Sequence, residues 1–158
     1  MPRTVSATAR AALQARETPE VFLCLLTLAH PSWVTPIRVV NDGVGHTAGG
    51  QDYLSFPFDI TMPPETEEGQ PKVTLEICNV DRQIVAAVRG VSGDPITVEL
   101  AVALASTPDV VEAGPYSFSL REASYDATVV SGTLAYEDLL NEPCPPRTMT
   151  PAVTPGLF

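Results

Sequence analysis

The sequence predicts one mainly β domain, a β-sandwich or barrel, with one helix at the N-terminus, one short internal helix and a proline-rich arm at the C-terminus. Its length of 158 residues suits a single domain. Apolar and polar residues alternate over several stretches after residue 20, which is typical of half-buried strands. The 16 prolines lie at intervals and exclude long uninterrupted helices through most of the chain. We therefore divide the chain into a helical segment (1–19), a β domain (20–142) and an extended arm (143–158).

The N-terminal helix is predicted over residues 4–17, which are rich in alanine. Thr4 or Ser6 can cap its first turn, and Pro19 ends it. Its apolar face is thin, so the helix would be marginal in isolation and is expected to dock on another surface. That face comprises Val5, Ala9, Ala12 and Leu13.

The first half of the β domain opens with residues 21–28, which are apolar on both faces and predict a central strand between two layers. Residues 37–40 predict a short second strand. Residues 41–52 are rich in Gly, Asn and Asp and predict a turn region, after which 53–56 begin another strand. Residues 63–71 predict an acidic loop.

The second half contains the clearest alternation. Residues 72–77 predict a half-buried strand, and 79–90 a short helix that Asn79 or Asp81 caps and Gly90 ends. Three further strands follow, each with apolar residues at every second position. They centre on residues 96–104, 116–121 and 130–136. The C-terminal arm holds five prolines and no periodicity.

Composition excludes several classes of function. With 9 basic against 19 acidic residues, the formal charge is -10, and nucleic-acid recognition needs clustered cations that this chain lacks. The three cysteines form no CxxC pair, so neither a disulfide framework nor a metal site is indicated; they are Cys24, Cys78 and Cys144. No secretory leader is visible, and the longest apolar run is far shorter than a membrane span. We expect a soluble protein without a cofactor, assembled inside a cell.

Catalytic motifs are also missing. His30 precedes a proline and His46 lies in the glycine-rich region, so both are expected to be ordinary turn or surface histidines. Gly43–Ala48 matches the relaxed dinucleotide pattern GxGxxA, but turn and strand residues follow it where that pattern requires a helix. A hairpin loop is the prediction there. No serine lies in a nucleophile elbow, and we do not expect an enzyme.

Five stretches together resemble a domain of unknown function found on minor tail proteins of phages and prophages. The resemblance depends on the order and spacing of many segments over residues 20–158. The stretches are IRVVND (Ile37–Asp42), YLSFPFDI (Tyr53–Ile60), ICNVDRQIVAAVR (Ile77–Arg89), STPDVVEAGPYSFSLREASYD (Ser106–Asp126) and LNEPCPPRTMTPAVTPGLF (Leu140–Phe158).

The resemblance implies a structural protein of the virion tail tip, similar to a distal tail protein and assembled in the host cytoplasm. It implies a tail-tube-like β-sandwich, of which six copies form a ring between the tail tube protein and the tail-tip hub protein, with the tape-measure protein as a further neighbour. Neither a membrane nor a specific nucleic acid is an implied partner. Some neighbouring tip proteins hold an iron–sulfur cluster with four cysteines; this chain has three, so no cluster is expected.

Two sets of residues are candidates for roles in such a ring. The end of the arm is expected to contact a neighbouring subunit, although it could equally pack on its own domain or be disordered; the residues are Pro155, Leu157 and Phe158. Acidic loop residues without basic partners are expected to face a lumen through which DNA passes. They are Asp42, Asp52, Glu65, Glu67 and Glu68. The alternative functions are a tail assembly chaperone or a monomeric binding module that the virion does not retain.

Overall fold

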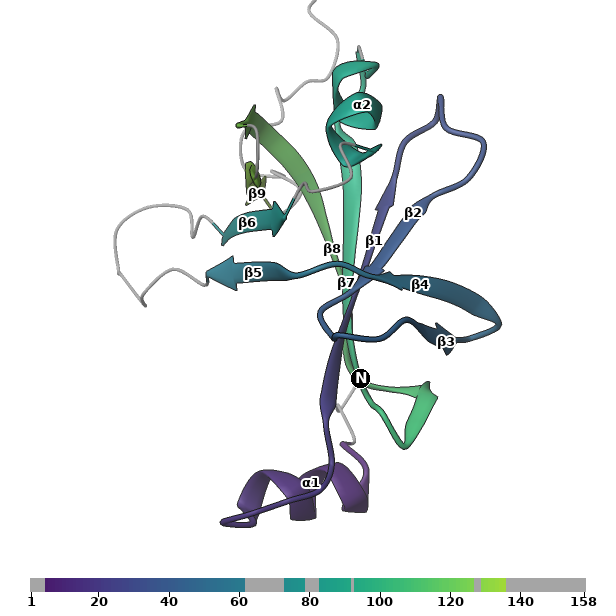
Figure 1. Cartoon of the computed structure of the whole chain (residues 1–158), viewed down its shortest axis with the longest axis vertical. Coiled ribbons are helices and arrows are strands. Elements are labelled where there is room, and N and C mark those ends of the chain that lie inside the picture. The colour runs from purple at the N-terminus through teal and green to yellow at the C-terminus, as the bar shows by residue number, and fades with distance from the viewer. Residues whose placement is uncertain (1–4, 62–72, 79–82, 92, 127–128, 136–158) are drawn as a thin grey trace, which may run out of the picture.

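The computed structural model describes residues 5–61, 73–78, 83–91, 93–126 and 129–135, which form nine strands and two helices (Figure 1). The predicted mainly β fold, with an N-terminal helix and a short internal helix, is confirmed. In chain order the elements are α1 (Ala7–Gln14), β1 (Phe22–Ala29), β2 (Ile37–Val40), β3 (His46–Ala48), β4 (Gln51–Ser55), β5 (Phe58–Thr61), β6 (Val73–Cys78), α2 (Gln83–Arg89), β7 (Ile96–Leu104), β8 (Thr107–Tyr125) and β9 (Val129–Ala135).

Hydrogen bonds join the described strands into one nine-stranded sheet in the order β3-β4-β2-β1-β7-β8-β9-β6-β5. The pairing of β2 with β4 is parallel, and the other described pairs are antiparallel. The sheet is not closed, because β3 and β5 form its two edges. In Figure 1, β4 and β5 run across the view while β1, β7 and β8 run along the long axis, so the two ends of the sheet turn away from its centre.

This turning buries β1 on both faces, as the apolar run 21–28 predicts. Successive side chains of a strand point to opposite faces. Leu23 and Leu25 belong to a small apolar cluster with residues of β2, β3 and β7. Leu26 and Leu28 point to the opposite face of β1 and belong to the main core. Residues of β5, β6, α2, β8 and β9 also contribute to this core. The central strand therefore lies between two separate cores.

Helix α2 covers the main core. Ile84 and Val85 are buried there, and Arg89 at the end of the helix lies over the Tyr125 ring of β8, 4.3 Å from its centroid. A cation over an aromatic ring is attracted by the ring quadrupole. The predicted caps Asn79 and Asp81 lie outside the described residues.

Helix α1 is shorter than predicted, because Ala15 is already extended. Ser6 is the N-cap, and its Oγ accepts a hydrogen bond from the Ala9 N–H at 3.0 Å. The predicted apolar face is only partly correct: the two alanines Ala9 and Ala12 are buried, whereas Leu13 is 66% exposed. The small side chains of Ala9 and Ala12 let the helix pack closely against the domain. Leu13, next to this face, remains in solvent.

Two strand segments were not predicted. The turn region 41–52 contains β3, which pairs with β4 through Gly49 and Gly50 at φ +58° and +71°. Two positive φ values in a two-residue connection favour a tight hairpin. The second segment is the first half of β8, where register shifts opposite β7 remove the alternation. No helix in the described part of the chain is long and apolar enough to cross a membrane.

Candidate functional site

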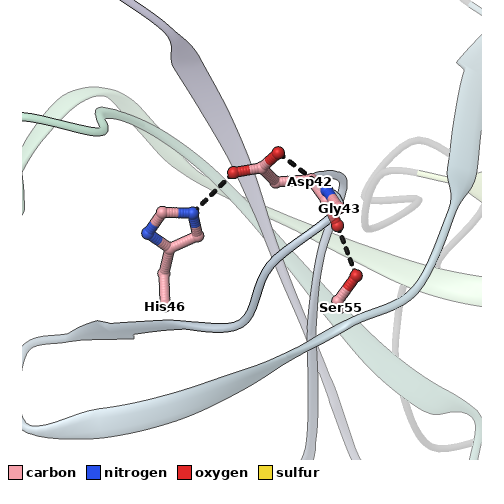
Figure 2. Close-up of polar contacts among 4 residues, drawn as sticks. All are labelled: Asp42, Gly43, His46 and Ser55. Carbon is pink, nitrogen blue, oxygen red and sulfur yellow. Dashed lines mark hydrogen bonds and ion pairs between the residues drawn. The ribbon is translucent and has the colours of Figure 1, made fainter.

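The connection between β2 and β4 gathers polar residues around Asp42 (Figure 2). The Nε2 of His46, at the start of β3, lies 2.6 Å from Oδ2 of Asp42, and the Gly43 N–H donates to Oδ1 at 2.7 Å. The hydrogen bond from His46, followed by that from Gly43, holds the pKa of the Asp42 carboxyl below its ordinary value. Both side chains are partly exposed, so this hydrogen-bonded pair lies at the surface.

Ser55 is the fourth residue of this group, but the hydrogen bonds among Ser55, His46 and Asp42 are not those of a catalytic triad. Its Oγ donates to the main-chain carbonyl of Asp42, so the hydroxyl bonds to the backbone, while the imidazole bonds to the carboxylate. A triad needs the base hydrogen-bonded to the nucleophile, with the carboxylate on the other ring nitrogen. These contacts instead join β2, the loop after it and β4, and they fix the shape of the loop.

The glycines of the GxGxxA pattern serve the same loop. A Cβ on Gly45 would lie 3.0 Å from the Tyr53 carbonyl oxygen, which shows how closely the loop approaches β4. The pattern leads into β3 and a turn, and no helix N-terminus follows it. The prediction of a hairpin loop over Gly43–Ala48 is wrong in its position, because His46–Ala48 form β3 and the hairpin turn follows at Gly49 and Gly50. The geometry of a dinucleotide site is absent from this loop.

The acidic residues predicted to face a lumen fall into two groups. Asp42 and Asp52 lie in the β2–β4 region, where Asp52 accepts a hydrogen bond from Thr47 Oγ1 at 2.8 Å across the hairpin. The premise that these acids lack basic partners is wrong for Asp42, which His46 contacts. The other three lie outside the described residues: Glu65, Glu67 and Glu68.

The candidate contacts of the arm, Pro155, Leu157 and Phe158, also lie outside the described residues, as does Cys144. Cys24 and Cys78 are free thiols, and burial raises the pKa of Cys24. Within the described ranges, no three His, Cys, Asp or Glu side chains lie together in a way that could hold a metal ion.

His30 is buried, and its bonds determine its protonation. Nε2 lies 3.1 Å from the Asp94 carbonyl oxygen, and Nδ1 lies 3.1 Å from the Ser32 N–H and 2.7 Å from its Oγ. Because a carbonyl only accepts and a main-chain N–H only donates, the hydrogen-bond network assigns a neutral ring with its proton on Nε2. The prediction of a turn histidine is confirmed, and the ring serves to tie the β1–β2 loop to the turn before β7.

Two buried or bridging carboxylates were not predicted at all. Glu112 of β8 is buried, and its Oε2 accepts the Ser6 N–H at 2.7 Å. Hydrogen bonding to Ser6 lowers the pKa of Glu112. The Ser6 side chain has the larger effect and its main-chain N–H the smaller. Asp109 of β8 accepts the Gly49 N–H at 2.8 Å and so ties the β3–β4 turn to β8. Main-chain N–H groups in turns and at helix starts need hydrogen-bond acceptors. This general rule predicts that some acceptor is present, but it does not identify Glu112 or Asp109.

Large apolar side chains are exposed at several places in the described part of the chain, including Val34 in the β1–β2 loop and Tyr125 at the end of β8. At the α1 end of the molecule, Ser6 bonds to Glu112 of β8, and the Ala105 N–H donates to the Val21 carbonyl. The large exposed apolar residues of these segments are Leu13, Val21, Val110 and Val111. In the β2–β4 region they are Val44 and Leu54. Exposed apolar clusters with a polar rim are typical of interaction surfaces.

Comparison with known proteins assigns the chain to one family. No curated protein matches the chain. One family model matches residues 8–149 and therefore covers both helices and all nine described strands except the first residue of α1. That family is described as a domain of unknown function, DUF1833. The chain belongs to this DUF1833 family.

Proposed function

We propose that the protein is a structural component of the tail tip of a long-tailed phage, where copies of it form a ring that connects the tail tube to the hub. The observation that carries this proposal is the ordered resemblance of five segments to minor tail proteins. Four of those segments lie wholly within the region that the family model matches, and the fifth, Leu140–Phe158, lies partly within it.

The surface of the protein supports assembly by side-chain contacts more than by strand pairing. In β5, the Ile60 N–H donates to Oδ1 of Asp59 at 2.9 Å. This N–H is therefore not free to pair with a strand of another chain. At the other edge, β8 lies beside β3, and Asp109 binds the turn that follows it. Protected edges are a common way to prevent uncontrolled strand addition. The exposed apolar patches remain available for contacts between subunits.

A closed ring needs two different complementary surfaces on each subunit. The exposed apolar residues near α1 and those of the β3–β4 hairpin are candidates for contacts between subunits. The formal charge of -10 suits a ring through which DNA passes, because an acidic wall does not retain phosphate. In this proposal Asp42, Asp52 and the acidic residues of 63–71 line the passage.

Mass spectrometry of purified particles, combined with gold-labelled antibody against the chain, tests the proposal. We expect the chain to be present in particles, with the label at the end of the tail. A chain that is abundant in infected cells but missing from particles supports the alternative, a tail assembly chaperone or a monomeric binding module.

A truncation tests the arm. Removal of residues 143–158, which include Leu157 and Phe158, is expected to weaken the association of copies and the incorporation of the chain into particles. If the truncated chain assembles as well as the full chain, the arm has no role in subunit contacts.

A further inference from the structure

We propose that Asp42–Gly43 is a site of isoaspartate formation and that His46 is the positioning residue that slows this modification. Asp42 and Gly43 form the only Asp-Gly pair in the sequence. In such a pair the main-chain nitrogen of the glycine can attack the carboxyl carbon of the aspartate, because glycine has no side chain to hinder the approach. The modification depends on this loop alone and is independent of the proposed ring.

The reaction needs no reagent other than water. The nitrogen of Gly43 forms a bond to Cγ of Asp42; the carboxyl group loses its hydroxyl and the nitrogen its proton, and the two leave together as water. Water then adds to one carbonyl of the resulting succinimide ring. Addition at Cγ restores aspartate. Addition at the main-chain carbonyl carbon breaks its bond to the nitrogen, so that the main chain passes through Cγ, one carbon longer, with the carboxylate on Cα.

The two reacting groups lie next to each other and are open to water. Asp42 is partly exposed in the loop after β2, and Gly43 is exposed. The Gly43 N–H donates to Oδ1 of Asp42 at 2.7 Å, so the nitrogen and the carboxyl group are in contact (Figure 2). A Cβ at Gly43 would meet nothing within 4 Å. Contact of this kind removes most of the entropy cost of bringing the two groups together.

Three hydrogen bonds nevertheless hold the pair in an unreactive arrangement (Figure 2). The N–H of Gly43 points at Oδ1, whereas the attack uses the electron pair of the nitrogen, which lies out of the peptide plane. Ser55 Oγ donates to the main-chain carbonyl of Asp42, which must turn as the ring closes. His46 Nε2 lies 2.6 Å from Oδ2 and donates its hydrogen, because a carboxylate only accepts. Ring closure therefore requires these bonds to break.

His46 acts on the reactivity of the carboxyl group as well as on its position. The neutral acid is the form that can lose its hydroxyl, whereas an ionised carboxylate resists attack. The hydrogen bond from His46 is the largest cause that lowers the pKa of Asp42, and the bond from Gly43 is the second. Loss of the imidazole therefore frees the side chain to turn and also raises the fraction of neutral acid.

Asp59 provides a comparison within the same chain. Its Oδ1 accepts the N–H of Ile60 at 2.9 Å, which is the same contact between an aspartate and the next residue. Here the next residue is β-branched, and both residues lie in β5, where they pair with β6. A branched side chain and a paired strand hinder closure of the ring. Asp59 is therefore expected to remain unmodified under conditions in which Asp42 converts.

The test ages the purified full chain at neutral pH and measures isoaspartate by liquid chromatography and electron-transfer fragmentation of peptides. In the wild-type chain we expect slow accumulation at Asp42 and none at Asp59. His46→Ala is expected to raise the rate at Asp42 up to about fivefold, which corresponds to a surface contact of about 1 kcal/mol. His46→Gln, whose amide nitrogen can donate to the same oxygen, is expected to restore most of the protection.

Two further variants separate this chemistry from a general loosening of the loop. Gly43→Ala places a methyl group beside the nitrogen in open space and is expected to slow the conversion while the circular dichroism spectrum stays unchanged. Thr47→Val removes the hydrogen bond to Asp52 in the same hairpin but no contact of Asp42, so it is expected to convert at the wild-type rate. The inference is overturned if His46→Ala forms isoaspartate no faster than the wild-type chain, or if Thr47→Val accelerates it equally.

Discussion

The main-chain N–H of Ser6 donates a 2.7 Å hydrogen bond to Oε2 of Glu112, and this bond joins the start of α1 to β8 across 106 positions of sequence. Glu112 thus places a carboxylate at the N-terminus of a helix, where the helix dipole favours negative charge. Its second oxygen is buried without a hydrogen-bond partner in the described part of the chain. The contact fixes the position of the helix that carries Leu13.

Replacement of Glu112 by Ala is expected to loosen α1 without unfolding the sheet. The Ser6 N–H loses its acceptor and the helix start loses its favourable charge, so the amides of residues 7–14 are expected to exchange faster with deuterium than in the wild-type chain. Hydrogen-exchange mass spectrometry measures this. Glu99→Ala, at an exposed position of β7, is the control and is expected to leave the exchange of α1 unchanged.

Acid is expected to weaken the fold through Asp42 and Glu112. Both pKa values are lowered in the folded chain, so the carboxylate form stabilises the fold. This contribution is complete above the ordinary carboxyl pKa of about 4 and is lost as the pH falls through the lowered values. The melting temperature of the wild-type chain should therefore fall more steeply below pH ~4 than that of the Asp42→Asn, Glu112→Gln double variant. Parallel profiles for the two chains contradict this account.

Gly114→Ala is expected to destabilise the protein strongly. Gly114 has φ +96°, and a Cβ there would lie 2.7 Å from the Leu100 carbonyl oxygen of the neighbouring strand. The backbone conformation alone costs a non-glycine residue about 1–3 kcal/mol, and the contact adds to it. Chemical denaturation measures the loss. Gly43→Ala is the control, because nothing lies within 4 Å of its Cβ and its φ is not in the left-handed range; its effect should stay within about 0.5 kcal/mol.

The two histidines should differ in their effect on stability. His30→Ala leaves the Asp94 carbonyl and the Ser32 N–H without their partner in a buried turn, so a loss of about 1–3 kcal/mol is expected. His46→Ala removes one partly exposed contact with Asp42, and such surface contacts contribute about 0–1 kcal/mol. Urea unfolding of both variants tests the contrast, and an equal loss in the two would show that the β1–β2 turn does not depend on His30.

The strands with regular alternation could be predicted from sequence, because each has one buried face. In β7 the residues Ile96, Val98 and Leu100 are buried, as their spacing indicates. The strand β3 was missed because three residues are too few to show a period. The first half of β8 could not be predicted because register shifts opposite β7 break the alternation of buried and exposed residues.

The polar contacts were harder to predict than the strands. The sequence showed Asp42 and His46 four residues apart in a glycine-rich loop, but their contact depends on the course of the backbone between them. The bonds of Glu112 to Ser6 and of Asp109 to Gly49 link residues 106 and 60 positions apart, and the topology of the sheet alone brings them together. No local pattern indicates such pairs.

The central claim, that copies of this chain form a ring in the tail tip, is tested most directly by cryo-electron microscopy of purified tails at a resolution that traces β-strands. The account predicts a closed ring of six copies of this nine-stranded sheet between the tube and the hub. A complete map of the tail tip in which other proteins account for all the density would contradict it.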